Sequence, residues 1–353
     1  MKRKKRLSII GITVALILLG GVPRADAEEF FQGKTIRFLV GFAAGGGFDT
    51  YSRMIARHIG KHIPGHPSTV VENMTGAGSL VAANYLYRKA DPDGLTIGNF
   101  IGPLVLQDAL GNKAAQFDGR KFGWLGVPTP DSGVCVLTNA SGINSVDEWF
   151  KAKQAVKLGG TAPGSTTDDV PKIIKAAIDL PIQMIEGYKG TSRIRVAAES
   201  GEIDGGCWAW ESIKPTWTKA LDSGAVRPVL QTMLESHPEL KHVPLAIEYA
   251  KTEDARELLK IIDGAYGVTA RPYAVPPGMP HDRLQLLQKA FMETMKDPEL
   301  LAESKKAQLE FKPIDGPTVA KIFAGFYEIK AATKERLRQI VLPGKRPVKG
   351  PGA

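Results

Sequence analysis

The residues of this sequence best suited to chemistry are a glycine run followed by an acid, Gly45-Gly46-Gly47-Phe48-Asp49. Glycine has no Cβ, so its backbone can approach a ligand closely and can adopt a positive φ angle. The unpaired N–H groups and the dipole of a following helix favour negative charge. The run therefore predicts a seat for an anion, and a plain tight turn between strand and helix is the alternative.

Two further loops repeat this chemistry. The glycines of Gly76-Ala77-Gly78 precede an expected helix at residues 80–89. The loop at residues 160–168 is rich in hydroxyl side chains and precedes an expected helix at residues 169–177. Because hydroxyls and unpaired N–H groups gather at a helix start, this loop predicts a second anion seat.

The elements around these loops alternate between strands and helices. Hydrophobic patterning predicts a helix at residues 49–63, with Asp49 or Thr50 as its N-cap, between strands at residues 36–42 and 69–72. A third strand at residues 95–101 stops at Gly102. Such an order indicates an α/β fold with mainly parallel sheets, whose ligands collect beyond the carboxyl ends of the strands.

The pattern restarts after the Pro/Gly-rich segment at residues 128–133. Strands are expected at residues 134–138, 155–159 and 226–232, an extended return at residues 264–274, and one long closing helix at residues 319–340.

The N-terminus has the features of a secretion signal. Residues 2–6 are all basic, residues 7–22 are apolar, and Ala25-Asp26-Ala27 matches the small-x-small cleavage pattern. The apolar run is shorter than the roughly 18 residues that a membrane-spanning helix needs. We expect residues 1–27 to be cleaved and the protein to be periplasmic, with an uncleaved membrane-anchoring start as the alternative.

Cleavage changes the charge balance. The whole chain has 46 basic and 37 acidic residues and a net charge of +9. Without the six basic residues and one acid of the signal, 40 and 36 remain, so the net charge is +4. This mild balance suits anionic solutes and lacks the clustered basic stripe of a nucleic-acid binder.

The remaining 326 residues exceed what one hydrophobic core usually serves. We expect two lobes joined by a hinge near residues 128–134 and 262–272, with lobe 1 at residues 28–130 plus 263–343, lobe 2 at residues 131–262, and a mobile tail at residues 344–353. Cys135 and Cys207 are the two cysteines of the chain. One disulfide or two separate buried thiols are both compatible with the sequence.

The whole mature chain resembles the solute receptors of the tripartite tricarboxylate transporter family, also called Bug-type receptors. Short blocks carry the resemblance through their order and spacing, namely residues 36–42 with 45–49, residues 70–73 with 76–78, and residues 90–96, 187–191, 201–204 and 274–280. The chain departs from the family pattern at Ala43-Ala44 and Met74-Thr75, where the family often has proline and an arginine-proline pair. These departures put the identity of the ligand in more doubt than the fold.

The resemblance implies a two-lobed periplasmic binding protein of type II-like fold. It implies capture of a small carboxylate and delivery to a membrane permease. The sequence does not choose among solutes, since a dicarboxylate, a tricarboxylate, an aromatic acid, an amino acid or a neutral vitamin-like amide all fit a glycine-lined seat. The resemblance further implies a monomer without enzymatic activity, cofactor or metal. The expected ligand-binding residues are Ala44, Gly45, Gly46, Gly47, Asp49, Gly76, Ala77, Gly78 and Gly102 in the first lobe, and Thr161, Gly164, Ser165, Thr166 and Trp208 in the second.

Two of these residues have specific expectations. Because its carboxylate would repel a ligand carboxylate, Asp49 should act indirectly, by binding water or capping the helix. If residues 205–210 form a strand that faces the cleft, Trp208 and Trp210 share one face and favour an aromatic or bulky ligand. Packing of both indoles in the core is the alternative.

The sequence gives weaker evidence for other functions. His58 and His62 have the spacing of a helical zinc pair, but Lys61 would oppose a cation, so a solvated helix face is the preferred interpretation. No Gly-x-Ser-x-Gly, Walker loop or complete dinucleotide fingerprint occurs. An extracytoplasmic enzyme acting on a carboxylate, using Tyr188, Lys189 or Asp204 as an acid or base, is the alternative, as is a solute sensor.

Overall fold

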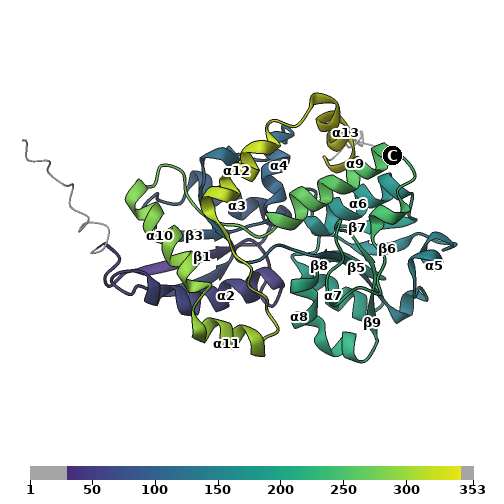
Figure 1. Ribbon diagram of the computed structural model, residues 1–353, viewed down its shortest axis with the longest axis horizontal. Helices are drawn as coiled ribbons and strands as arrows, with labels where there is room; N and C mark the ends of the chain where they lie inside the picture. The colour runs from purple at the N-terminus through teal and green to yellow at the C-terminus, as the bar shows by residue number, and fades with distance from the viewer. Residues whose placement is uncertain (1–29, 343–353) are drawn as a thin grey trace, which may run out of the picture.

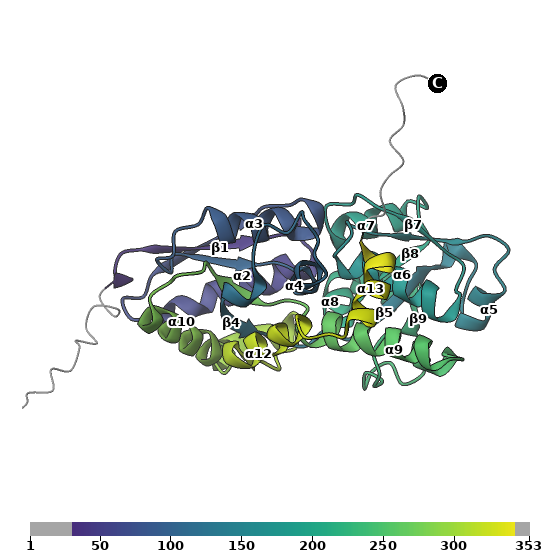
Figure 2. The same cartoon turned by 90° about the horizontal axis from the view of Figure 1, so that it is seen from above.

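The computed structural model describes residues 30–342, which build two β-sheets side by side in an elongated molecule (Figure 1, Figure 2). The expected signal peptide and the expected tail at residues 344–353 lie outside the described residues. None of the helices in the described part is long and apolar enough to cross a membrane.

The first sheet has the strand order β11-β4-β10-β3-β1-β2. Strand β1 pairs in parallel with β2 and β3, whereas β10 pairs antiparallel with both β3 and β4. The strands are β1 (Thr35–Val40), β2 (Ser68–Asn73), β3 (Thr96–Asn99), β4 (Gly123–Val127), β10 (Tyr273–Val275) and β11 (Ile314–Asp315).

The second sheet has the order β7-β6-β8-β5-β9. Strand β6 pairs in parallel with β7 and β8, and β5 pairs antiparallel with β8 and β9. The strands are β5 (Gly133–Thr138), β6 (Val156–Gly159), β7 (Ile182–Ile185), β8 (Gly205–Ala209) and β9 (Val226–Gln231). The predicted two-sheet α/β class is confirmed, but the expectation of mainly parallel sheets is wrong, because three of the five pairings in the first sheet and two of the four in the second are antiparallel.

Helices cover both faces of each sheet. Apolar residues of α2 and α10 pack on one face of the first sheet, and those of α3, α4 and α12 pack on the other. In the second sheet, α6 covers one face and is backed by α9 and α13, while α7 and α8 cover the opposite face. The helices are α2 (Gly47–Ile59), α3 (Leu80–Arg88), α4 (Pro103–Ala109), α5 (Val146–Phe150), α6 (Thr166–Ile178), α7 (Thr191–Glu199), α8 (Trp210–Asp222), α9 (Glu253–Ile261), α10 (His281–Thr294), α11 (Pro298–Lys306), α12 (Gly316–Phe326) and α13 (Ala331–Val341).

The chain passes between the two sheets at three places. The first is the short segment from β4 to β5, and the second is a π-helix at Ile262–Val268, where the sequence had predicted an extended return. The third lies between α12 and α13, because the expected single closing helix breaks after Phe326 and α13 packs against α6. The expected lobe limits remain a prediction.

The two cysteines are joined by a disulfide. Cys135 on β5 and Cys207 on β8 are directly opposite residues of an antiparallel pair, and they are 72 residues apart in the sequence. A covalent link between two central strands restricts the unfolded chain by closing this loop.

We predict that the Cys135→Ala/Cys207→Ala double variant loses about 2–4 kcal/mol of unfolding free energy, because its unfolded chain is no longer cross-linked. Denaturant unfolding with and without a reductant measures this. Reduction should bring the wild-type protein to the stability of the double variant. Two reactive thiols in denatured, unreduced protein would contradict the link.

Candidate functional site

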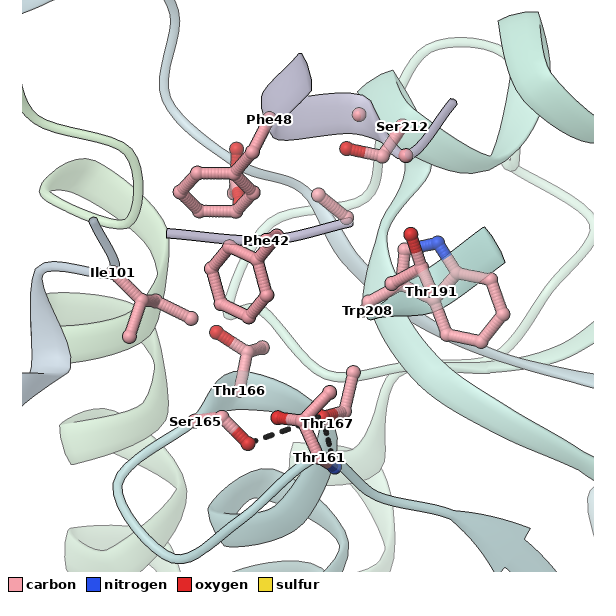
Figure 3. A pocket seen from close by; sticks show the side chains of 14 residues that line it. Phe42, Phe48, Ile101, Thr161, Ser165, Thr166, Thr167, Thr191, Trp208 and Ser212 are labelled. Atoms are coloured by element: carbon pink, nitrogen blue, oxygen red, sulfur yellow. Dashed lines mark hydrogen bonds between the residues drawn. The ribbon is translucent and has the colours of Figure 1, made fainter. Parts of the chain in front are cut away.

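A cavity lies where the two sheets meet, and Figure 3 shows its lining side chains. About 440 Å³ of space, part of it open to solvent, lies between the lining atoms. Phe42, Gly46, Gly47, Phe48 and Ile101 line it from the first sheet; Asp131 lines it from the segment between the sheets; and Thr161, Ser165, Thr166, Thr167, Thr191, Trp208, Ala209 and Ser212 line it from the second.

On the first-sheet side, the glycine run forms the N-terminus of α2. The helix begins at Gly47 with Gly46 as its N-cap and without a side-chain cap, so the prediction of Asp49 or Thr50 as the cap is wrong. A Cβ on Gly47 would lie 1.9 Å from Ser212 Oγ and 2.4 Å from Ser212 Cβ. Glycine is therefore required here for the close approach of α2 to α8.

Asp49, in the first turn of α2, fixes the glycine loop through hydrogen bonds. Its carboxylate is buried and accepts hydrogen bonds from the Gly45 N–H at 2.9 Å, from Asn73 Nδ2 at 2.9 Å and from Arg53 Nε. Burial disfavours the charged form, but these donors outweigh it and hold the pKa of Asp49 below its ordinary value. Asp49 is absent from the cavity lining and orients the loop that carries Gly46 and Gly47.

On the second-sheet side, a network of hydroxyls forms the N-terminus of α6. Thr167 Oγ1 lies 3.1 Å from the Thr161 N–H, from Thr161 Oγ1 and from Ser165 Oγ. Ser165 occupies the N-cap position, yet its hydroxyl donates to the Ala162 carbonyl. Thr166 Oγ1 is buried and has no hydrogen-bond partner among the described residues.

A second buried acid, Asp169, holds this loop through hydrogen bonds. Asp169 Oδ1 accepts from the Gly164 N–H at 3.0 Å, and its Oδ2 accepts from Tyr266 Oη at 2.7 Å and from Gln107 Nε2 at 3.0 Å. Burial raises the pKa of Asp169 to about 7, against these hydrogen bonds. Asp169 therefore ties the loop to α4 of the first sheet and to the π-helix.

The electrostatics of the cavity come from neutral groups. The backbone N–H groups of Gly47, Phe48, Thr166 and Thr167 have no acceptor within residues 30–342. Asp131 is the one ionisable side chain in the lining, and the fully buried guanidinium of Arg271 pairs with it. The cavity thus presents helix N-termini and hydroxyls, a donor set that suits an anion.

The structure brings together part of the expected site. Gly46, Gly47, Thr161, Ser165, Thr166 and Trp208 line the cavity. Outside the lining lie two exposed residues of the first loop, Ala44 and Gly45; the second glycine loop of Gly76, Ala77 and Gly78; and three positions behind the wall, Asp49, Gly102 and Gly164.

The residues outside the lining have other contacts. A Cβ on Gly78 would lie 3.2 Å from Ser165 Cβ, so the second glycine loop packs against the hydroxyl loop. The Gly102 N–H donates to the Ala270 carbonyl at 2.9 Å, and a Cβ there would clash with the Thr269 carbonyl. The contact of Gly78 lets the two halves of the molecule approach one another, whereas that of Gly102 holds the start of α4 against residues 269–270.

Several lining residues were not expected from the sequence. The aromatic pair Phe42 and Phe48 flanks the predicted glycine run, and Thr167 lies inside the predicted hydroxyl loop, so proximity was an available signal. Asp131 lies in the predicted hinge and Thr191 in the resemblance block at residues 187–191, but neither was assigned to the site. Ser212 had no signal, because it reaches the cavity only through the packing of α8. Ile101 ends the strand predicted at residues 95–101, and Ala209 lies within the strand predicted at residues 205–210.

The two tryptophans are buried in one hydrophobic cluster, so the alternative of core packing is confirmed, although Trp208 also lines the cavity. Strand β8 ends at Ala209, and Trp210 begins α8, so the alternation expected from a continuous strand is interrupted. Trp208 lines the cavity and stacks on Trp217, whereas Trp210 Nε1 donates to Glu239 Oε2 at 2.9 Å.

The histidine pair of α2 and the following turn contacts α11. His58 Nε2 lies 2.7 Å from Glu303 Oε2, and His62 Nε2 lies 2.8 Å from Asp297 Oδ2, so the expectation of a solvated helix face is wrong. The ligating atoms of His58, Asp297 and Glu299 come within 4.8 Å of one another. The Lys61 ammonium forms ion pairs with Asp297 and Glu299, so we assign no metal to this cluster.

Comparisons with known proteins support the resemblance found in the sequence. No family model matches the chain. The "UPF0065 protein in gbd 5'region" of Cupriavidus necator is 25% identical over 96% of this chain and 98% of its own length. A UPF0065 protein of Agrobacterium vitis, from the TAR-I ttuE-ttuC' intergenic region, is 29% identical over 52% of this chain and 53% of its own length.

Solved structures show the same fold. The periplasmic binding protein BugD has a TM-score of 0.66 at 20% identity, covering 84% of this chain and 96% of its own. The structure of R. palustris Rpa4515 with adipate has a TM-score of 0.68 at 18% identity, covering 87% of this chain and 97% of its own. The structure of MatC from Rhodopseudomonas palustris with bound malate has a TM-score of 0.67 at 18% identity, covering 87% of this chain and 99% of its own. The predicted resemblance to Bug-type receptors and the two-lobed binding-protein fold are confirmed.

We predict that Asp49→Ala lowers the free energy of unfolding by about 1.5–3 kcal/mol, because it removes the buried carboxylate that accepts hydrogen bonds from Gly45, Asn73 and Arg53. Denaturant unfolding measures the change. Glu72→Ala is the control, since its carboxylate is 49% exposed and pairs with Arg37 at 3.4 Å; it should cost less than about 1 kcal/mol. Equal effects of the two substitutions would refute the supporting role of Asp49.

The raised pKa of Asp169 predicts that the stability of the protein depends on pH. Its pKa is about 7 in the folded protein against an ordinary 3.8, so the folded state holds a proton that the unfolded state releases between these values. Stability should therefore fall as pH rises through this window, by up to about 1.4 kcal/mol per pH unit.

Urea unfolding at several pH values between 5 and 8, in wild type and in Asp169→Asn, isolates this contribution. Other acids titrate in both proteins, so the difference between the two unfolding free energies reports on Asp169. As pH rises, this difference should change in favour of the variant, because the wild type loses stability that Asp169→Asn does not lose. A difference that stays constant across the range would contradict the raised pKa.

Proposed function

We propose that this protein is a periplasmic solute receptor that captures a small carboxylate between its lobes and delivers it to a tripartite tricarboxylate-type permease. The observation that carries the proposal is the cavity where the N-termini of α2 and α6 meet, with unpaired N–H groups, free hydroxyl capacity and no basic side chain in its lining. These donors can bind an oxyanion and release it again.

The carboxylate is favoured by the chemistry of the donors and by the relatives. Hydroxyls and amides at a helix start bind a planar oxyanion through short, charge-assisted hydrogen bonds. Rpa4515 and MatC were solved with adipate and malate, both carboxylates. We extend this ligand class to the present chain, with Gly46, Gly47, Thr161, Ser165 and Thr166 as direct ligand contacts.

Lobe closure is the proposed motion. We assign lobe 1 to residues 28–130 plus 263–343 and lobe 2 to residues 131–262, with the segments near residues 128–134 and 262–272 as the hinge. Contacts across the cleft describe a closed form: the Ala43 N–H donates to the Lys189 carbonyl at 3.1 Å, and Arg195 Nη2 donates to the Gly45 carbonyl at 3.1 Å. Closure removes water and strengthens the hydrogen bonds to the ligand.

The protein is proposed to bind without catalysis. The lining hydroxyls have no histidine, lysine or cysteine beside them in the cavity, and the carboxylate of Asp131 is paired with Arg271. Activation of a nucleophile needs a base within hydrogen-bond reach. We also propose that the receptor acts as a monomer, without a cofactor.

The test is a ligand-dependent rise in melting temperature with small mono-, di- and tricarboxylates, together with mass spectrometry of the recovered ligand. A ligand that binds only the native state raises its stability by mass action, and a receptor returns it unchanged. Chemical conversion would support an enzyme, and no shift with any carboxylate would overturn the proposal.

In the same assay, Gly47→Ala should weaken binding at least about tenfold, because the new methyl group clashes with Ser212 only when the lobes are closed. Its unfolding free energy without ligand should change little, since separation of the lobes relieves the clash. Gly325→Ala in α12 is the matched control, as a Cβ there meets no atom within 4 Å. Wild-type affinity in Gly47→Ala would argue against closure.

A further inference from the structure

Aromatic side chains form much of the cavity wall. Phe42 and Phe48 have ring centroids 4.6 Å apart at an interplanar angle of 50°. Trp208 stacks on Trp217 with centroids 5.8 Å apart at 15°, so its indole is backed by a second indole. Figure 3 shows the hydroxyls of Thr161, Ser165, Thr166 and Thr167 on one side of the cavity, across from the phenylalanine rings.

Two polar atoms in this wall have no partner within the described residues, Trp208 Nε1 and Thr166 Oγ1. Their residues are 3% and 6% exposed, so water does not satisfy them from the surface. A buried donor left unpaired is costly, and such a group in a native protein calls for an explanation. The indole N–H can only donate, so it requires an acceptor. An acceptor supplied by the ligand meets this requirement.

For a second carboxylate the lining offers the free backbone N–H groups of Gly47 and Phe48 and no basic side chain. The charged group at the cavity wall is Asp131, whose carboxylate pairs with the Arg271 guanidinium. Ser212 Oγ accepts from Arg271 Nη2 at 3.0 Å, and Arg271 Nη1 has no partner within the described residues, but Arg271 itself lies outside the lining. The remaining wall beyond the hydroxyls is apolar, with Phe42, Phe48 and Ile101. Placing a second anion against it would strip the anion of water without an ion pair.

We propose that the ligand is an aromatic monocarboxylate and that Trp208 determines this specificity. The carboxylate binds at the N-terminus of α6, to Thr166 Oγ1 and the free N–H groups of Thr166 and Thr167. The ring packs against Phe42 and Phe48, and an acceptor atom of the ligand receives the Trp208 Nε1 hydrogen. This inference rests on the proposed receptor function and narrows its ligand class.

Calorimetric titration of the full protein with benzoate, 4-hydroxybenzoate, cyclohexanecarboxylate, adipate and malate tests the ligand class. One of the two aromatic acids should bind at least about tenfold more tightly than cyclohexanecarboxylate, which matches benzoate in size but has no flat π-face. Tighter binding of adipate or malate would overturn the aromatic inference and leave the receptor function standing. Binding of none of the five acids would overturn both.

Substitution tests the role of the indole N–H. Trp208→Phe keeps an aromatic ring and removes the donor, so the affinity for the preferred aromatic acid should fall about tenfold. Trp210→Phe is the matched control, because its Nε1 pairs with Glu239 away from the cavity, and it should bind like wild type. Unchanged affinity in Trp208→Phe would overturn the proposed role.

Thr166→Val keeps the test decisive where Trp208→Phe does not fold. Valine has the shape of threonine and lacks the hydroxyl, so the affinity should fall while the melting temperature without ligand is retained. Loss of affinity in Thr166→Val confirms the carboxylate position at α6. Retained affinity there would contradict it.

Discussion

The arrangement of this structure depends on the unpaired backbone N–H groups at the N-termini of two helices, which can donate hydrogen bonds to an anion. An anion held by such groups needs no basic side chain, but it needs the helix ends to meet at one place. The N-termini of α2 and α6 come from different sheets, and both line the same cavity. The glycine at the start of α2 lets α8 approach closely enough to close that cavity.

The two helix ends share a supporting device. In each, an acid within the first four residues reaches back to the N–H of a glycine with positive φ, Asp49 to Gly45 and Asp169 to Gly164. A hydrogen bond from the loop back to an acid in the first turn fixes the loop relative to its helix. The partners differ, because Asp49 also has the guanidinium of Arg53, whereas Asp169 has only neutral donors and a raised pKa. The same geometry is thus stabilised by an acid of lowered pKa in one lobe and by an acid of raised pKa in the other.

The cavity combines this anion seat with an aromatic wall. The Arg271 guanidinium pairs with Asp131, donates to Ser212 and lies over the rings of Phe48 and Tyr51, so it stabilises the junction between the sheets from outside the lining. The ligand therefore meets neutral donors on one side and rings on the other. Affinity from such a wall depends on ligand shape as well as charge.

Local patterns in the sequence determined the class of fold, the strand-loop-helix units and two of the anion seats, because glycine, hydroxyl residues and hydrophobic periodicity act over a few neighbours. They also supported the resemblance to Bug-type receptors. The tertiary structure alone decided that Trp208 faces the cavity while Trp210 faces Glu239, that Cys135 pairs with Cys207, and that Thr191 and Ser212 join the site. These outcomes depend on the register and packing of segments far apart in the chain, which no short stretch of residues encodes.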